Sequence, residues 1–293
     1  MKLSTSSNLV FTRPDGRIMP LTEMMRMGKE AGFTRFDLNF YDWSLPGSPF
    51  LTEGWRQWID QVAEEKERLG VTFGQCHAYT YNFLDRALTE EEKERHEELV
   101  MRSLTCCHLV EATLCVTHPD TDFSAVCQTR ISREKNRQYF AALLEKAAGL
   151  GLELAVENMC DAAISPRRKY GASAEELAEL MDLMGDDRIG VCWDFEHGEI
   201  MKQDQEQSIL LLGKHLKATH VSDTHSATDP DLMHVMPLFG KIDWKACVRA
   251  LKKVNYQGDF SFEVSHYGEC FPDELLKPAL KLAWEIGEYL MGL

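Results

Sequence analysis

The sequence lacks the cysteine pattern of a disulfide framework. Its nine cysteines are an odd number, and no two of them form a C-x-x-C pair. Cys76, Cys115 and Cys192 stand inside apolar runs, where a reduced cysteine behaves as a small hydrophobic residue. We therefore expect a protein of a reducing compartment, without structural disulfides.

Long hydrophobic runs are missing as well. No stretch has the number of consecutive apolar residues that a bilayer-spanning helix requires. Residues 1–11 contain no continuous apolar segment of the kind found in signal peptides. These absences predict a cytoplasmic protein that has no membrane partner.

Basic residues are too few to balance the acids. Lys and Arg total 32 against 47 Asp and Glu, which gives a net charge of −15. Because such a surface repels polyanions, we expect no nucleic-acid partner. The hydrophobic content of 44% is ordinary for a globular protein with a sizeable core. No linker or change of composition divides residues 1–293, so we expect one domain.

The chain does contain a recurring order of strand, loop and helix. Short apolar runs such as 189–193 carry no alternating polar residues, which is typical of strands buried on both faces. Strands are predicted at 3–11, 33–40, 71–77, 110–118, 152–158, 189–193, 216–223 and 258–264. Helices are predicted at 20–31, 51–69, 90–107, 132–150, 173–185, 199–214, 241–254 and 273–290. Ser132 and Ser173 are predicted N-caps, the latter in a capping box with Glu176.

Strict alternation of strands and helices predicts a parallel sheet with helical crossovers. Eight repeats fit a closed (β/α)8 TIM barrel, which typically takes ~250 residues. The alternative is an open doubly wound sheet, but no G-x-G-x-x-G follows the first strand. We therefore expect an α/β fold, with residues 1–293 forming a single TIM-barrel domain.

Polar side chains recur where the predicted strands end. In a barrel of this kind the carboxyl ends of the strands surround the active site. The candidates in chain order are His77, His118, Glu157, Asp194, His197, His220, Asp223, His225 and Glu263. Three carboxylates aimed at one cavity repel one another unless a cation or shared protons neutralise them.

Two further groups of side chains, one aromatic and one basic, are candidates for contact with a substrate. Trp43 belongs to an aromatic group, with Phe40 and Tyr41, after the second predicted strand, and this group either walls a ligand or packs the loops. Arg168 lies in the basic run 167–169 after the fifth strand, which suits either an anionic ligand or a solvated loop.

The ordered motifs resemble those of the xylose isomerase-like TIM barrels, from about Gly32 onward. That superfamily includes sugar and sugar-phosphate isomerases, ketose 3-epimerases and endonuclease IV. The matching segments are Ala-Val-Glu157-Asn, Asp194-x-x-His197, His220-Val-Ser-Asp, Glu263 and the segment 231–244 that contains His234. One departure is Asn39, which stands near the end of the second predicted strand, where many members carry an acid.

The resemblance implies one divalent metal ion, Mn, Mg, Co or Zn, bound by Glu157, Asp194, His220 and Glu263. It implies that His197 contacts the substrate or, as in multi-metal relatives, a second metal. Further candidates for substrate contact are His77, His118, Asp223, His225, His234, Trp43 and Arg168.

The activity implied is isomerisation or epimerisation of a small sugar or sugar phosphate. Glu157 and Glu263 would act as an acid–base pair through a metal-stabilised enediolate. The expected partner is a small-molecule carbohydrate, and assembly as a homodimer or homotetramer stays open. Alternatives are a polyol dehydratase using the same metal, an endonuclease IV-like repair enzyme and a sugar-binding barrel without turnover. The repair enzyme is disfavoured by the acidic charge and by the spacing of Asp231 and His234.

Overall fold

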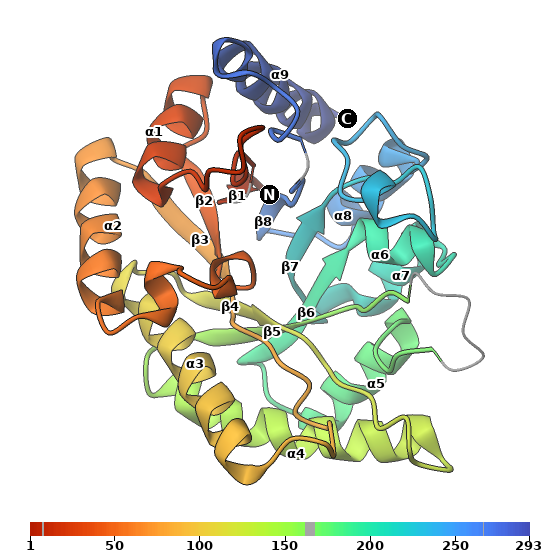
Figure 1. The fold of residues 1–293 in the computed structure, drawn as a ribbon. Coiled ribbons are helices and arrows are strands. Elements are labelled where there is room, and N and C mark those ends of the chain that lie inside the picture. The colour runs from red at the N-terminus through yellow and green to blue at the C-terminus, as the bar shows by residue number, and fades with distance from the viewer. Residues whose placement is uncertain (8, 162–167, 266) are drawn as a thin grey trace.

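Eight parallel strands close into a barrel surrounded by helices (Figure 1). The computed structural model describes residues 1–7, 9–161, 168–265 and 267–293. The strands follow chain order around the barrel, and β8 closes it by pairing with β1. Their bounds are β1 Lys2–Ser6, β2 Arg35–Asn39, β3 Thr72–His77, β4 Leu114–Thr117, β5 Glu153–Glu157, β6 Ile189–Asp194, β7 Leu216–Val221 and β8 Asp259–Phe262. The predicted TIM barrel is thus confirmed.

The helices lie outside the barrel, and all but the last, α9, connect successive strands (Figure 1). They are α1 Leu21–Ala31, α2 Trp55–Leu69, α3 Glu90–Leu109, α4 Gln128–Ala148, α5 Ala174–Met184, α6 Phe195–Ile200, α7 Gln205–Leu212, α8 Trp244–Lys253 and α9 Asp273–Gly292. Short 3-10 turns occur at η1 Asp42–Ser44, η2 Pro49–Leu51, η3 Gly213–His215 and η4 Pro230–Leu232. Among the described residues, no helix combines the length and apolarity needed to cross a membrane.

Two helix predictions were wrong in detail. The helix expected at 199–214 is divided into α6 and α7. α6 begins earlier, at Phe195 with Asp194 as its N-cap, and Lys202 between the two helices has a φ of 55°. Ser132 is not an N-cap, because α4 begins at Gln128; the Ser132 hydroxyl instead accepts a hydrogen bond from the Asp122 N–H.

The N-cap predicted at Ser173 is confirmed, but the capping box is not. The Ser173 hydroxyl accepts the Glu176 N–H. The Glu176 carboxylate is taken instead by Arg168 and by the Gly171 N–H.

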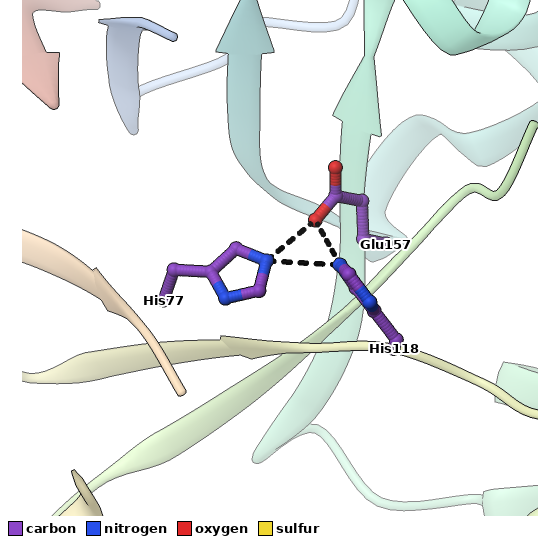
Figure 2. A group of neighbouring side chains, drawn as sticks. All are labelled: His77, His118 and Glu157. Atoms are coloured by element: carbon purple, nitrogen blue, oxygen red, sulfur yellow. Dashed lines mark hydrogen bonds and ion pairs between the residues drawn. The ribbon is translucent and has the colours of Figure 1, made fainter. Parts of the chain in front are cut away.

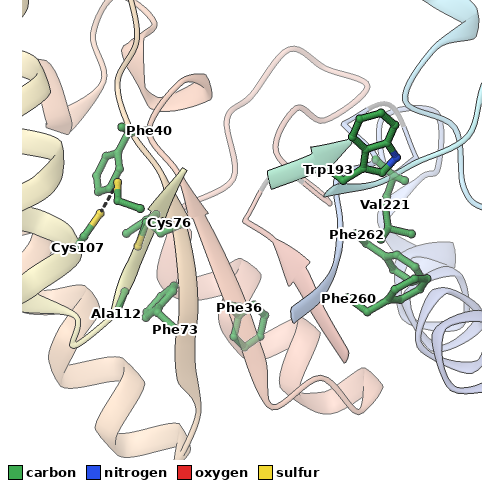
Figure 3. Close-up of a cluster of buried hydrophobic side chains, with 14 of the residues drawn as sticks. Phe36, Phe40, Phe73, Cys76, Cys107, Ala112, Trp193, Val221, Phe260 and Phe262 are labelled. Atoms are coloured by element: carbon green, nitrogen blue, oxygen red, sulfur yellow. Dashed lines mark hydrogen bonds between the residues drawn. The ribbon is translucent and has the colours of Figure 1, made fainter. Parts of the chain in front are cut away.

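Side chains that point outward from the strands pack against the helices. Figure 3 shows Phe36 and Phe73 on adjacent strands, with Phe260 and Phe262 on β8. All four are nearly or fully buried, and they belong to one continuous core. Burial of this apolar surface is the main stabilising contribution to the barrel.

Side chains that point into the barrel divide it into two chemically different halves. Residues from β4 to β7 form a small apolar cluster of Val116, Ala155, Cys192 and Ala218. On β2, β3 and β8 the inward positions are polar. They include Asp37, Gln75 and Ser261, which are joined by hydrogen bonds. The polar half reaches two of the strand ends, since Ser261 precedes Glu263 by two residues and Asp37 Oδ2 lies 3.4 Å from His220 Nε2.

A β-bulge at Gly74 makes room for an ion pair at the opposite end of the barrel. Phe36 pairs with Phe73 and Asp37 with Gln75, so Gly74 is the extra residue. A Cβ atom there would lie 1.8 Å from Asp259 Oδ2, and this carboxylate is held by Arg35 at 2.6 Å. Only glycine therefore fits this position.

We expect Gly74→Ala to destabilise the protein by about 1–3 kcal/mol or more, because the added methyl group displaces the buried ion pair. The denaturant midpoint measures the loss. Gly149→Ala is the matched control, since its backbone is helical and its Cβ meets nothing closer than 3.4 Å. Equal midpoints for the two variants would contradict this packing.

Candidate active site

Six polar side chains predicted from strand ends meet at one mouth of the barrel. His77, Glu157 and Asp194 are the last residues of β3, β5 and β6. The other three are His118 just after β4, His220 near the end of β7 and Glu263 just after β8. The parallel arrangement brings them together because every strand ends on the same side.

Four of them form a group suited to a cation. Glu157, Asp194, His220 and Glu263 are all buried, and one donor atom of each lies within 4.8 Å of the others. The His220 Nδ1 atom lies 3.1 Å from Glu157 Oε1 and 3.0 Å from Glu263 Oε2. Three carboxylates and one imidazole therefore face a common point.

An orphaned oxygen supports the fit to a metal ion. Asp194 Oδ1 accepts the His197 N–H at 2.6 Å, whereas Oδ2 is buried without a hydrogen-bond partner among the described residues. A buried carboxylate oxygen normally has a partner, because leaving it unpaired costs free energy. Three oxygen donors and one nitrogen suit Mn, Mg, Co or Zn, so the residues fit the implied ion.

The ionisation of Asp194 and His220 reflects this crowding. Burial raises the pKa of Asp194 to about 7; His197 opposes the rise, and Glu157 and Glu263 add to it. Burial alone would lower the pKa of His220, but the carboxylates of Glu263 and Glu157 raise it well above its ordinary value. A protonated His220 thus supplies positive charge at the place where a cation would supply it.

The two glutamates are held ionised. Burial would raise the pKa of both, but the charge and hydrogen bonds of neighbouring histidines reverse the effect. His220, His118 and His77 hold the pKa of Glu157 well below its ordinary value. His220 is the main cause that lowers the pKa of Glu263 to about 2. Both carboxylates are therefore proton acceptors at neutral pH.

A second group shares Glu157. His77 Nε2 and His118 Nε2 each lie 3.2 Å from Glu157 Oε2 and 2.9 Å from each other, as Figure 2 shows. Glu157 thus offers Oε1 to the first group and Oε2 to the second. The second group also has the composition of a cation site. The exposed ring of Tyr41 lies 6.3 Å from the His77 ring and 6.4 Å from the His118 ring.

His197 and His234 flank the first group. Their ring centroids are 6.3 Å apart, and each ring is held at Nδ1 by a main-chain oxygen. The oxygen belongs to Asn158 for His197, at 2.7 Å, and to Glu263 for His234, at 3.3 Å. His234 has a φ of 50°, a conformation that a non-glycine residue rarely adopts.

Several residues that order the site were not predicted as site residues. Asn39 Nδ2 donates to Glu263 Oε1 at 2.9 Å, and Asn158 binds the main chain of Asp194 through both ends of its amide. The buried Glu196 accepts the Ser222 hydroxyl and the His234 N–H. The inward alternation of β2 was the available signal for Asn39, and the position after Glu157 was the signal for Asn158.

Three of the predicted substrate residues have other partners in the structure, and a fourth, His225, faces solvent. The Asp223 carboxylate is turned into its own loop, where it accepts the Lys241 N–H at 2.8 Å and the Trp244 Nε1–H at 2.9 Å. The remaining two are Trp43, which packs against Phe11 and Trp58, and Arg168, which forms a bidentate pair with Glu176 at 2.8 and 2.9 Å. Arg167 of the same basic run lies outside the described residues.

Cation affinity is expected to rise with pH. A cation and protons compete for the same atoms, and the pKa of Asp194 in the metal-free protein is about 7. Each displaced proton weakens binding about tenfold per pH unit below that pKa. Titrations of metal-free protein at pH 5.5, 6.25 and 7 measure the slope. A dissociation constant that is unchanged over this range would contradict the ligand roles of Asp194 and of His220, whose pKa is also raised.

The sequence matches one family model and one curated relative. A family model described as xylose isomerase-like TIM barrel matches residues 25–284. An uncharacterized protein, y4fM of Sinorhizobium fredii, is 33% identical over 86 residues, which is 29% of this chain. The chain spans 27% of the length of that relative.

Solved structures with the same fold cover the whole chain. An IOLI protein with a bound zinc atom has a TM-score of 0.79 at 17% identity, with 100% of this chain and 98% of that one covered. A xylose isomerase domain protein from Alicyclobacillus acidocaldarius has a TM-score of 0.76 at 17% identity, with the same coverage. An L-ribulose 3-epimerase has a TM-score of 0.74 at 14% identity, with 100% and 95% covered. At these identities the likeness establishes the fold.

Proposed function

Because the chain belongs to the xylose isomerase-like TIM barrel family, we propose that it is a metal-dependent isomerase or epimerase of a small sugar or sugar phosphate. The observation that carries the proposal is the buried group of Glu157, Asp194, His220 and Glu263, with its orphaned Asp194 oxygen. The bound zinc of the IOLI protein and the activity named for the L-ribulose 3-epimerase support it through the shared fold.

The four residues of this group would hold one divalent cation. When bound, such an ion stabilises the negative charge that develops on a substrate oxygen as the neighbouring carbon loses its proton. Glu157 and Glu263 reach His220 Nδ1 from β5 and from the end of β8, so they approach a substrate from different directions.

Proton transfer then falls to the two glutamates. One ionised carboxylate accepts the proton from carbon. The other takes up a proton from solvent and delivers it to the substrate, and the first then loses its proton to solvent, so that both end the cycle ionised. Return to the opposite face of the same carbon gives an epimer, whereas return to the neighbouring carbon interconverts aldose and ketose. His197 and His234 lie beside the group and would orient substrate hydroxyl groups.

Solvent isotope exchange tests the reaction type. The metal-loaded protein is incubated in deuterated water with a panel of ketoses, aldoses and their phosphates. We expect deuterium to enter a carbon next to the carbonyl of the accepted sugar. A product that has lost water would instead identify a dehydratase. Absence of both exchange and product across the panel would contradict the proposed class.

A second candidate function rests on the His77–His118–Glu157 group. A glutamate shared by two cation sites is suited to hydrolysis of phosphodiesters by paired metals, as in an endonuclease IV-like enzyme. The net charge of −15 opposes binding to a duplex. Cleavage of a duplex with an abasic site, without exchange into any sugar, would reverse the order of the two candidates.

A further inference from the structure

The Nε2 atom of His220, on the side of the ring away from the four-residue group, lies near a carboxylate inside the barrel. His220 Nδ1 faces Glu157 and Glu263, whereas Nε2 points to Asp37 Oδ2 at 3.4 Å. Both side chains are only 1% exposed. By strict geometry Nε2 has no hydrogen-bond partner among the described residues, so Asp37 is the acceptor within its reach.

Neighbouring strands hold the Asp37 carboxylate in place. Gln75 Nε2 on β3 donates to Oδ2 at 2.8 Å, and Ser261 Oγ on β8 lies 3.2 Å from the same oxygen. Asp37 itself lies on β2, two residues before Asn39. Three strands thus fix the oxygen that faces His220.

A cation that binds the His220 ring displaces one of its two protons, and the position of the remaining proton decides whether Nδ1 is free to bind the ion. With the proton on Nδ1, the ring donates to Glu157 Oε1 or Glu263 Oε2, which lie 3.1 and 3.0 Å away, and that nitrogen is blocked. With the proton on Nε2, the Nδ1 lone pair faces the group of carboxylates. A buried Nε2–H requires an acceptor, since an unpaired one costs free energy.

We propose that Asp37 is the positioning residue that selects the cation-binding tautomer of His220. It accepts the Nε2 proton, turns the Nδ1 lone pair toward Glu157 and Glu263, and makes the ring a stronger donor to the ion. This inference rests on the proposed metal site. It adds a residue that touches neither the substrate nor the ion.

Two variants with the same number of side-chain heavy atoms separate the acceptor role from simple packing. Asp37→Leu removes the acceptor. Asp37→Asn keeps one, because the donors Gln75 and Ser261 hold the amide oxygen at the Oδ2 position. Zinc affinity of metal-free protein is measured by competition with a chelator. We expect a loss of about 10- to 100-fold for Asp37→Leu and substantial rescue in Asp37→Asn.

A spectroscopic readout accompanies the titration. In zinc-loaded protein labelled with 15N-histidine, the His220 Nε2–H proton should appear at low field and exchange slowly. The resonance is assigned by its loss in His220→Gln. It should persist in Asp37→Asn and move upfield in Asp37→Leu. If the leucine variant does not fold, the wild-type resonance decides: its absence or rapid exchange overturns the proposal.

The possible results distinguish a failure of the Asp37 role from a failure of the metal site itself. Wild-type affinity in Asp37→Leu overturns the role of Asp37 and leaves the metal site intact. Equal losses in the leucine and asparagine variants also overturn it, because they show dependence on charge or packing and not on an acceptor. If the wild-type protein itself does not bind zinc, the metal site fails and this role fails with it.

Discussion

Replacing Glu263 with glutamine will lower kcat by about 10²- to 10⁴-fold while the barrel stays folded. Asn39 Nδ2 donates to Glu263 Oε1, so the new amide oxygen takes that position and the amide NH2 group replaces Oε2. Oε2 is the atom 3.0 Å from His220 Nδ1, on the side of the proposed cation. The variant therefore removes the proton acceptor and keeps the shape of the side chain.

Glu157→Gln is expected to behave similarly, since it substitutes the other proposed proton carrier. Steady-state kinetics on the accepted sugar measures both variants, and circular dichroism checks the fold. Glu153→Gln is the matched control because Glu153 lies on the same strand, four residues earlier, at the opposite end of the barrel, where it pairs with Lys217. If Glu157→Gln and Glu263→Gln both retain near wild-type turnover, the acid–base roles are wrong.

Removal of divalent cations will lower turnover by about 10²- to 10³-fold, because the ion contributes several kcal/mol of charge stabilisation in the transition state. It will also destabilise the fold. A cation present at ~100 times its Kd stabilises the folded protein by about 2.7 kcal/mol. Dialysis against a chelator, followed by return of Mn, Mg, Co or Zn separately, measures both effects.

Asp194→Asn provides the control for this experiment. The asparagine oxygen still accepts the His197 N–H, but the orphaned carboxylate oxygen is lost. We expect the variant to fold and to lose most of the cation-dependent rise in melting temperature. Full activity in the chelated wild-type protein, or an unchanged rise in the variant, would argue against a cation at this position.

Local pattern was sufficient to predict the barrel and the residues that converge at its mouth. The apolar run before Asp194 and the repeated helix–strand order indicated parallel strands, and parallel strands end on one side. His220 and Glu263 could therefore be placed near Glu157 although the sequence separates them widely. The two groups share Glu157 because its two oxygens face in different directions, which no sequence pattern specifies.

The direction of loop side chains could not be predicted in the same way. Asp223 follows β7 by two residues and Glu263 follows β8 by one, yet main-chain donors from residues 241 and 242 bind the Asp223 carboxylate. Arg168 is similarly taken by Glu176. Asp37 lies within a strand and not at its end, so its contact with His220 emerges only from the closed barrel.

Anomalous diffraction from crystals grown with manganese tests the central claim most directly. The account predicts a peak at the metal edge bounded by Glu157, Asp194, His220 and Glu263, with oxygen and nitrogen ligands at about 2.0–2.3 Å. The orphaned Asp194 Oδ2 should be among the ligands. A map in which these four side chains enclose no anomalous peak, while the ion is bound elsewhere or not at all, would contradict it.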